Sequence, residues 1–197
     1  MLSNRMTKYL AAASAATVCV GAANAAVVRW DSNLVIPANI DGYYINVETQ
    51  TFGVSGASVA GWDINPYSAT NLSWFNATGT GMMRYPGVTT GSAGSLAAGT
   101  VVGSASSNML GTGAVVFGSA AGNWTLNAQN YFGFKFLAAD GLTHFGYGRM
   151  DVGATALIRT VAFMEWESTA GTTISVVPAP GAFALLGLAG FAARRRR

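Results

Sequence analysis

The stretch that indicates the fold most strongly is residues 131–152, which read YFGFKFLAADGLTHFGYGRMDV. Phe132, Phe134 and Phe136 occupy alternate positions in its first half. Side chains two residues apart on a β-strand lie on the same face of the sheet. Asp140-Gly141, a typical turn sequence, follows. The stretch therefore predicts a β-hairpin whose first strand places three phenylalanines on one face.

The second half of this hairpin, residues 143–152, places Phe145 and Tyr147 together on one face. Glycines separate the aromatic residues in both halves. A glycine inside a strand is typical of a place where another backbone or a large ring approaches closely. We therefore expect rings or neighbouring strands to pack directly on the hairpin.

Further strands are predicted on both sides of this hairpin. In residues 43–49, Ile45 and Val47 point one way while Asn46 and Glu48 point the other. The remaining expected strands are residues 71–76, residues 155–167, and two edge strands at the β-branched islands 100–102 and 114–117 of a Gly/Ser/Ala/Thr-rich region.

The segment GWDINP at residues 61–66 interrupts the strand pattern, and Asn65-Pro66 predicts a turn. No convincing amphipathic helix occurs between residues 26 and 176. Short strands, glycine-rich turns and the absence of a helical pattern predict an all-β fold. The expected architecture is an antiparallel β-sandwich or jelly-roll-like domain.

The distribution of charge excludes one class of function. The formal net charge of the 197-residue chain is +3, but four of its eleven basic residues are the terminal Arg194, Arg195, Arg196 and Arg197. Residues 26–193 carry five bases and eight acids, a net charge of −3. This part of the chain has no basic patch, so we exclude nucleic-acid binding.

Residues 1–25 have the pattern of a secretory signal peptide with a signal helix. Arg5 and Lys8 precede an alanine-rich apolar run, and Ala23-Asn24-Ala25 is a small-x-small cleavage site that places the mature start at Ala26. The alternatives are an uncleaved anchor and a lipoprotein modified at Cys19. Cys19 is the only cysteine, so a mature chain starting at Ala26 has no thiol and no disulfide.

The last 21 residues, 177–197, read VPAPGAFALLGLAGFAARRRR. Pro178 and Pro180 cannot donate backbone hydrogen bonds and end the preceding strand. Residues 181–193 are all apolar or glycine, and the four arginines that follow predict a cytoplasmic C-terminus. We expect a transmembrane helix here. The chain thus divides into a signal peptide (1–25), a β domain (26–176) and a tail (177–197).

The tail resembles the PEP-CTERM protein-sorting domain. The resemblance rests on Val177-Pro178-Ala179-Pro180, the apolar segment and the arginine block, in that order; Ala179 replaces the family's glutamate. It implies a Gram-negative bacterium and an exosortase, a membrane transpeptidase that processes such tails. It also implies a role linked with exopolysaccharide and the biofilm matrix. The alternatives are an ordinary membrane anchor and a buried C-terminal segment.

The segments 61–67, 131–136 and 143–148 also resemble uncharacterised β-rich exported proteins that carry such tails. That second resemblance implies no activity.

Candidate catalytic groups are sparse. His144 is the only histidine, and no Gly-x-Ser-x-Gly motif accompanies it, so a structural role is favoured over a serine triad or a zinc site. Glu165 and Glu167 share one face of a strand at a spacing that a glycosidase could use. Two neighbouring strand carboxylates are more typical of a solvated face. We therefore expect no enzyme activity, no catalytic residue and no cofactor.

The residue types present raise two kinds of binding, of calcium and of carbohydrate. Asp63, Asp140 and Asp151 could contribute to a calcium site, but the dense ligand loop of such sites is missing and we predict no metal. Five tryptophans leave carbohydrate binding open, because a flat ring can stack on a sugar. Most are expected in the core, whereas Trp62 and Trp74 flank loop-like sequence and are the candidate glycan contacts.

The sequence as a whole predicts an exported protein of the cell surface or extracellular matrix. Its expected partners are the secretion machinery, an exosortase, the inner membrane through the tail, and exopolysaccharide as a candidate. The alternative is a carbohydrate-binding module, and less favourably a glycan-active enzyme.

Overall fold

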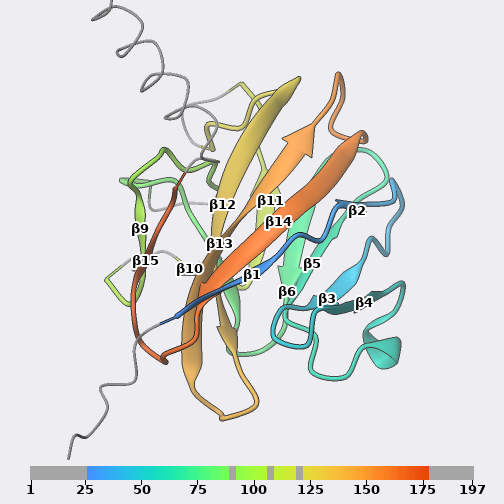
Figure 1. Cartoon of the computed structure of the whole chain (residues 1–197). Helices are drawn as coiled ribbons and strands as arrows, with labels where there is room; N and C mark the ends of the chain where they lie inside the picture. The colour runs from blue at the N-terminus through green and yellow to red at the C-terminus, as the bar shows by residue number, and fades with distance from the viewer. Residues whose placement is uncertain (1–25, 89–91, 106–108, 119–121, 178–197) are drawn as a thin grey trace, which may run out of the picture.

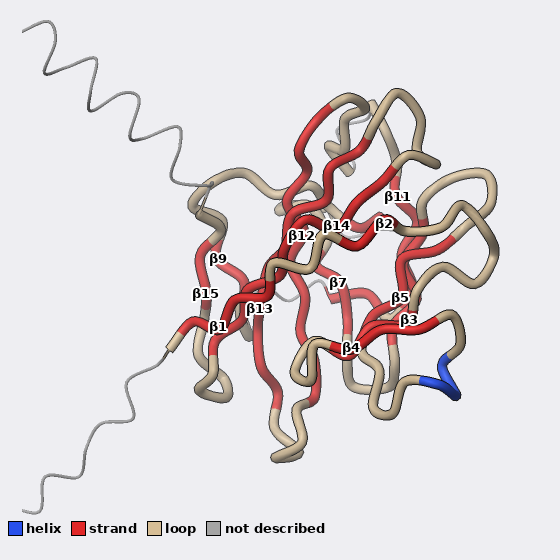
Figure 2. The backbone as a smooth tube through the Cα atoms, turned by 45° about the vertical axis from the view of Figure 1, so that its right-hand side comes forward, coloured by secondary structure: helices blue, strands red, loops and turns tan. Residues whose placement is uncertain are grey.

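The computed structural model describes residues 26–88, 92–105, 109–118 and 122–177. These residues form three β-sheets and one short 3-10 helix, η1 (Gly56–Ser58). The two larger sheets lie face to face (Figures 1 and 2), and the main hydrophobic core draws residues from both. The predicted all-β fold with antiparallel sheets is confirmed, and the arrangement is consistent with a β-sandwich.

The larger sheet has seven strands, of which six follow one another from edge to edge and β2 pairs with β14. In spatial order they are β1 (Val27–Trp30), β14 (Arg159–Glu167) with β2 (Leu34–Val35) beside it, β13 (Thr143–Val152), β12 (Ala128–Leu137), β7 (Gly81–Met83) and β10 (Met109–Leu110).

The second sheet has six strands, and a separate two-stranded ribbon accompanies the pair. The six are β4 (Thr51–Gly53), β3 (Tyr44–Asn46), β5 (Ile64–Tyr67), β6 (Ser73–Asn76), β11 (Thr112–Val115) and β8 (Ser92–Ala93), and the ribbon is β9 (Val101–Val102) with β15 (Ile174–Ser175). All pairings between named strands are antiparallel except β8 with β11.

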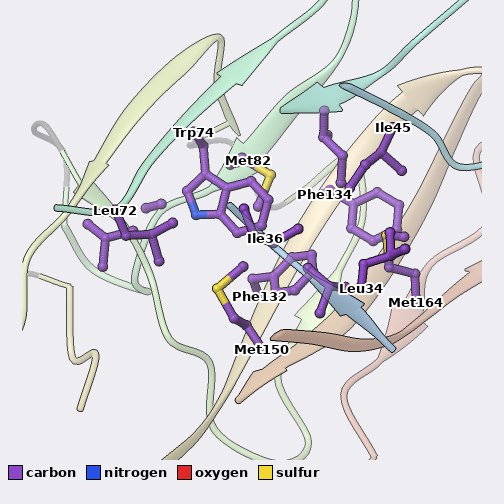
Figure 3. Packing of buried hydrophobic residues seen from close by; sticks show 14 of the residues in the cluster. Leu34, Ile36, Ile45, Leu72, Trp74, Met82, Phe132, Phe134, Met150 and Met164 are labelled. Atoms are coloured by element: carbon purple, nitrogen blue, oxygen red, sulfur yellow. The ribbon is translucent and has the colours of Figure 1, made fainter. Parts of the chain in front are cut away.

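The predicted hairpin is confirmed as β12 and β13, the two longest strands. Phe132, Phe134 and Phe136 are fully buried and face the second sheet, where the Trp74 ring lies 4.8 Å from that of Phe132 (Figure 3). Full burial of one phenylalanine side chain stabilises a fold by about 1.5–3 kcal/mol. This row of rings is therefore a major contributor to the free energy of folding.

The glycines of β13 leave room for these rings, as expected. Gly146 lies opposite Phe134 and Gly148 opposite Phe132. A Cβ atom added at either glycine would lie 2.5 Å from the facing phenylalanine ring. The aromatic residues of β12 and the glycines of β13 are thus complementary halves of one packing arrangement.

The outer face of the hairpin carries a second, smaller core. Phe145 and Tyr147 point to this face together, as predicted, and are buried there with Phe163 of β14. The ribbon β9–β15 supplies Val102 and Ile174 to the same cluster. The ribbon therefore covers part of the sheet that would otherwise face solvent.

The prediction of a turn at Asn65-Pro66 is wrong, because both residues lie within β5. Pro66 pairs with Trp74 of β6 and accepts a hydrogen bond from the Tyr43 N–H on its other side. A residue's nitrogen and carbonyl oxygen point to the same side of an antiparallel strand, so the missing N–H of Pro66 faces β3. Only Ile45 and Ile64 pair between β3 and β5, and the proline breaks no further pairing there.

Two other strand predictions need correction. The strand expected over residues 43–49 ends at Asn46, because the Asn46 side chain accepts a hydrogen bond from the Thr49 N–H and turns the chain. The island around Ala114 was expected at an edge, but β11 lies between β6 and β8. The final long strand begins at Arg159, within the predicted residues 155–167.

No helix in the part of the chain that the structure describes has the length and apolar composition needed to cross a membrane. The predicted signal helix (residues 1–25) and the predicted transmembrane segment (residues 181–193) lie outside the described residues.

Candidate functional site

The tryptophans divide into buried and surface residues. Trp74 and Trp124 are fully buried, Trp166 is 5% exposed, and Trp30 and Trp62 are half-buried. The prediction of Trp74 as a glycan contact is therefore wrong. Strand alternation turns Trp74 into the core and its neighbour Phe75 outward, where Phe75 is 43% exposed.

Trp62 is the surface ring with the most aromatic neighbours. Its ring meets that of Tyr44 edge-on at 4.9 Å and lies 5.5 Å from that of Phe75 at an interplanar angle of 36°. These three residues, from β3, the segment before β5, and β6, form what we call the aromatic strip. Sequence reasoning found Trp62 but missed Phe75, although the alternation of residues 73–76 requires either Trp74 or Phe75 to face outward.

Backbone contacts hold Trp62 in place. The Asn46 side chain donates hydrogen bonds to the carbonyls of Ala60 and Gly61, at 3.0 and 2.8 Å. The ring is also approached closely by η1, where a Cβ added at Gly56 would lie 2.9 Å from the Trp62 ring nitrogen. Trp62 therefore follows a turn that is fixed by hydrogen bonds and packs closely on η1, so a ligand would meet a preorganised ring.

A hollow of about 450 Å³ lies beside the aromatic strip. This volume is within the range of small-molecule sites, about 300–1,000 Å³. Its walls come from η1 and the segment that follows it, from the segment after β6, and from the end of β12. The lining residues are Gly56, Val59, Ala60, Gly61, Trp62, Asp63, Ala77, Thr78, Thr80 and Leu137.

Asp63 is the titratable group in the wall of this hollow, and it is only 3% exposed. Its Oδ2 accepts a 2.8 Å hydrogen bond from the Val47 N–H. Burial raises the pKa of Asp63 to about 7; the Val47 hydrogen bond lowers it, and the nearby Glu48 carboxylate raises it further. Its backbone carbonyl accepts from the Ala77 N–H and the Thr80 hydroxyl, so Asp63 ties three chain segments together.

The glutamates of β14 do not form the solvated face that the sequence favoured. Glu165 is bonded to the Arg29 guanidinium and accepts a 2.5 Å hydrogen bond from the Tyr147 hydroxyl. Burial, and then the Glu165 carboxylate, raise the pKa of Tyr147. Glu167 is 5% exposed. Glu165 is occupied by the contacts that fasten β1 and β13 to β14.

His144 lies in the structural environment that the sequence favoured. It is 5% exposed and stacks on Phe136 with a centroid distance of 5.6 Å. Its Nδ1 lies 2.9 Å from the Glu167 carbonyl oxygen and its Nε2 lies 3.2 Å from an Asp140 carboxylate oxygen. Both ring nitrogens thus have partners, one at the end of β14 and one in the turn of the central hairpin.

The three aspartates considered for calcium have separate surroundings. Asp63 lines the hollow, Asp140 accepts a hydrogen bond from the Leu142 N–H in the hairpin turn, and Asp151 pairs with Arg149. Among the described residues, no three His, Cys, Asp or Glu side chains come together in a group that could hold a metal ion.

Most residues predicted to act in export and sorting lie outside the described residues: Ala23, Ala25, Pro178, Ala179, Pro180, Arg194, Arg195, Arg196 and Arg197. The described chain includes the two flanking positions. The Ala26 N–H donates to the Ser168 hydroxyl at 3.1 Å, and the Val177 carbonyl oxygen lies 3.4 Å from the Tyr147 hydroxyl.

Comparisons of the chain with protein-family models, with curated proteins and with solved structures found no match.

Proposed function

We propose that this chain is an exported, non-catalytic protein of the cell surface or extracellular matrix, delivered by its N-terminal signal and sorted by its C-terminal tail. The support lies in the order of three tail features, Val177-Pro178-Ala179-Pro180, the apolar residues 181–193 and four arginines. The absence of cysteine after Cys19 is compatible with an oxidising compartment.

The observation that carries this proposal is the position of the two predicted processing points relative to the β domain. Strand β1 begins at Val27, two residues after the expected cleavage behind Ala25. At the other end, Val176 is buried and Val177 still contacts Tyr147. Removal of residues 1–25 and of a segment after Val177 would leave every described strand complete.

Intact-mass spectrometry of the secreted and membrane fractions tests this delivery route. The secreted form is expected to start at Ala26 and to lack Phe191 and the arginine block. A Pro178→Ala/Pro180→Ala double variant is expected to accumulate unprocessed in the membrane fraction. A control with Pro37→Ala should be processed like the wild type. A secreted mature form that retains Phe191 and the arginines would overturn the sorting proposal.

The aromatic strip favours a second, molecular function, which is binding of carbohydrate. Tyr44, Trp62 and Phe75 form a continuous row of rings at the surface, beside a hollow of small-molecule size. Aromatic side chains offer flat apolar area with little conformational entropy to lose. A sugar ring can stack on such a surface while its hydroxyls reach polar atoms in the hollow.

Glycan binding by full-length variants tests this function. Trp62→Ala and Phe75→Ala are each expected to weaken the binding of an oligosaccharide that the wild type binds by about tenfold or more. Each substitution removes a stacking surface from the centre of the contact. Phe52→Ala is the matched control. Phe52 is 46% exposed but packs on Tyr43 outside the strip. Equal affinity in all folded variants, as judged by circular dichroism, would exclude the strip as the binding surface.

A further inference from the structure

The hollow presents a carboxylate that still has accepting capacity. Asp63 is 97% buried, and only its Oδ2 receives a hydrogen bond from the described residues, from the Val47 N–H. The other carboxylate oxygen accepts no hydrogen bond from the described residues and is not sealed from solvent, so it can accept one from a bound molecule. The remaining oxygen therefore favours a ligand that brings a hydrogen-bond donor into the hollow.

The charges around the hollow disfavour an anionic ligand. Asp63 lines it, and Glu48 lies close enough to raise the pKa of Asp63. The Glu48 carboxylate is held there by a 2.8 Å hydrogen bond from the Ala139 N–H, next to the end of β12. No lysine or arginine is among the described residues that line the hollow. Above pH 7, where Asp63 is ionised, a uronate or sulfate group would meet like charge in a partly desolvated place.

The geometry points to a sugar-binding subsite that selects against acidic sugars: we propose that an uncharged pyranose stacks on Trp62 and donates a hydroxyl hydrogen bond to Asp63. This inference rests on the proposed carbohydrate binding and adds the class of ligand. Trp62 and Asp63 are consecutive residues that both line the hollow. One sugar residue can therefore contact the ring face and the carboxylate together.

The substitution Asp63→Asn changes this selectivity without removing the structural hydrogen bond. The asparagine carbonyl can still accept from the Val47 N–H, and its NH₂ group then replaces the free carboxylate oxygen at the hollow. The hydrogen-bond acceptor that suits a sugar hydroxyl is thus replaced by a hydrogen-bond donor that suits the carboxylate of a uronate. The variant should lose affinity for neutral sugars and lose its discrimination against uronates.

The experiment measures binding of full-length wild type, Asp63→Asn, Asp41→Asn and Trp62→Ala by calorimetry at about pH 8.5, above the pKa of Asp63. The probes are hexasaccharides of neutral glucose, mannose or galactose units and of galacturonate. The wild type should bind at least one neutral hexasaccharide about tenfold or more tightly than the galacturonate. Asp63→Asn should weaken that neutral binding about tenfold or more and bring the ratio close to one. Asp41 is an exposed acid outside the hollow, so Asp41→Asn should change neither value.

The possible failures are distinguishable. If Trp62→Ala abolishes neutral binding and Asp63→Asn changes neither affinity nor ratio, the subsite is wrong and the carbohydrate-binding function stands. Tighter wild-type binding of the galacturonate than of every neutral probe also overturns the subsite. If the wild type binds none of the hexasaccharides, the carbohydrate-binding function itself fails, and the subsite fails with it.

Discussion

Replacing Arg159 with methionine is expected to lower the free energy of unfolding by about 3–5 kcal/mol, because three backbone carbonyls would lose a charged hydrogen-bond donor. Arg159 is only 1% exposed. Its guanidinium donates to the carbonyls of Pro37 and Ser68 at 3.0 and 2.8 Å, and also to the Asn71 carbonyl. No carboxylate pairs with it among the described residues, and burial lowers its pKa to about 10.

The loss arises mainly from the carbonyls that methionine would leave behind. They belong to the segment after β2 and to the segment between β5 and β6, which Arg159 fastens to the start of β14. A buried carbonyl without a donor costs about 1–3 kcal/mol. Methionine fills much of the same space, so the experiment separates lost hydrogen bonds from a lost side chain.

Chemical denaturation of the full-length protein measures this effect. Arg149→Met is the matched control, because Arg149 pairs with Asp151 of the same strand, β13, and its side chain is 19% exposed. The control substitution should lower the free energy of unfolding by about 1 kcal/mol or less. The free energy of unfolding of Arg159→Lys should lie between those of the two methionine variants, since an ammonium group can donate hydrogen bonds to some of the three carbonyls. An Arg159→Met protein no less stable than Arg149→Met would contradict this role.

The second large effect is a fall in stability between about pH 4 and pH 7 that Asp63→Asn removes. The pKa of Asp63 is raised from 3.8 to about 7 by burial. Because the carboxyl pKa is higher in the folded state, the unfolded chain releases this proton at a lower pH than the folded protein does. The stabilisation is therefore complete below pH 3.8 and is lost as the pH rises to about 7. At about 1.36 kcal/mol for each pH unit, the loss attributable to Asp63 reaches on the order of 4 kcal/mol.

Urea denaturation at pH 4, 5, 6, 7 and 8 tests this expectation for wild type and Asp63→Asn. Other titrating groups act alike in both proteins, so the difference between the two curves isolates Asp63. Asp140 acts in the opposite direction, because hydrogen bonds from Leu142 and His144 lower its pKa and its contribution is lost as the pH falls. The variant should gain stability relative to wild type as pH rises and reach a plateau above pH 7. Parallel curves would show that Asp63 does not titrate in this range.

The central hairpin was predictable because its signals are local. Alternation assigned Phe132, Phe134 and Phe136 to one face, the Asp-Gly sequence placed the turn at Asp140-Gly141, and the structure confirms both. Pro66 shows where local signals fail. A proline usually marks a turn. Pro66 nevertheless fits in β5, because the N–H that it lacks would face β3, and β3 pairs with β5 only through Ile45 and Ile64.

The candidate site was only half predictable, for the same reason. Trp62 and Trp74 are the same residue type and both flank loop-like sequence, so the sequence alone does not distinguish them. Which of them reaches the surface depends on the register of β6 against β5, where Trp74 pairs with Pro66 on the inner face and Phe75 takes the outer one. Asp63 showed no sequence signal for its role, since its burial and the Val47 hydrogen bond to its carboxyl depend on how separate segments pack.

The sequence by itself determined the all-β class, the central aromatic hairpin, the acidic character of residues 26–193, and the patterns that predict export and sorting. These depend on side-chain period, composition and charge, which are properties of neighbouring residues. Only the tertiary structure decided that Arg159 and Asp63 are buried and that Trp62 and Phe75 form one surface. Burial and ring contacts are set by segments far apart in the chain, so they exist only after the sheets have paired.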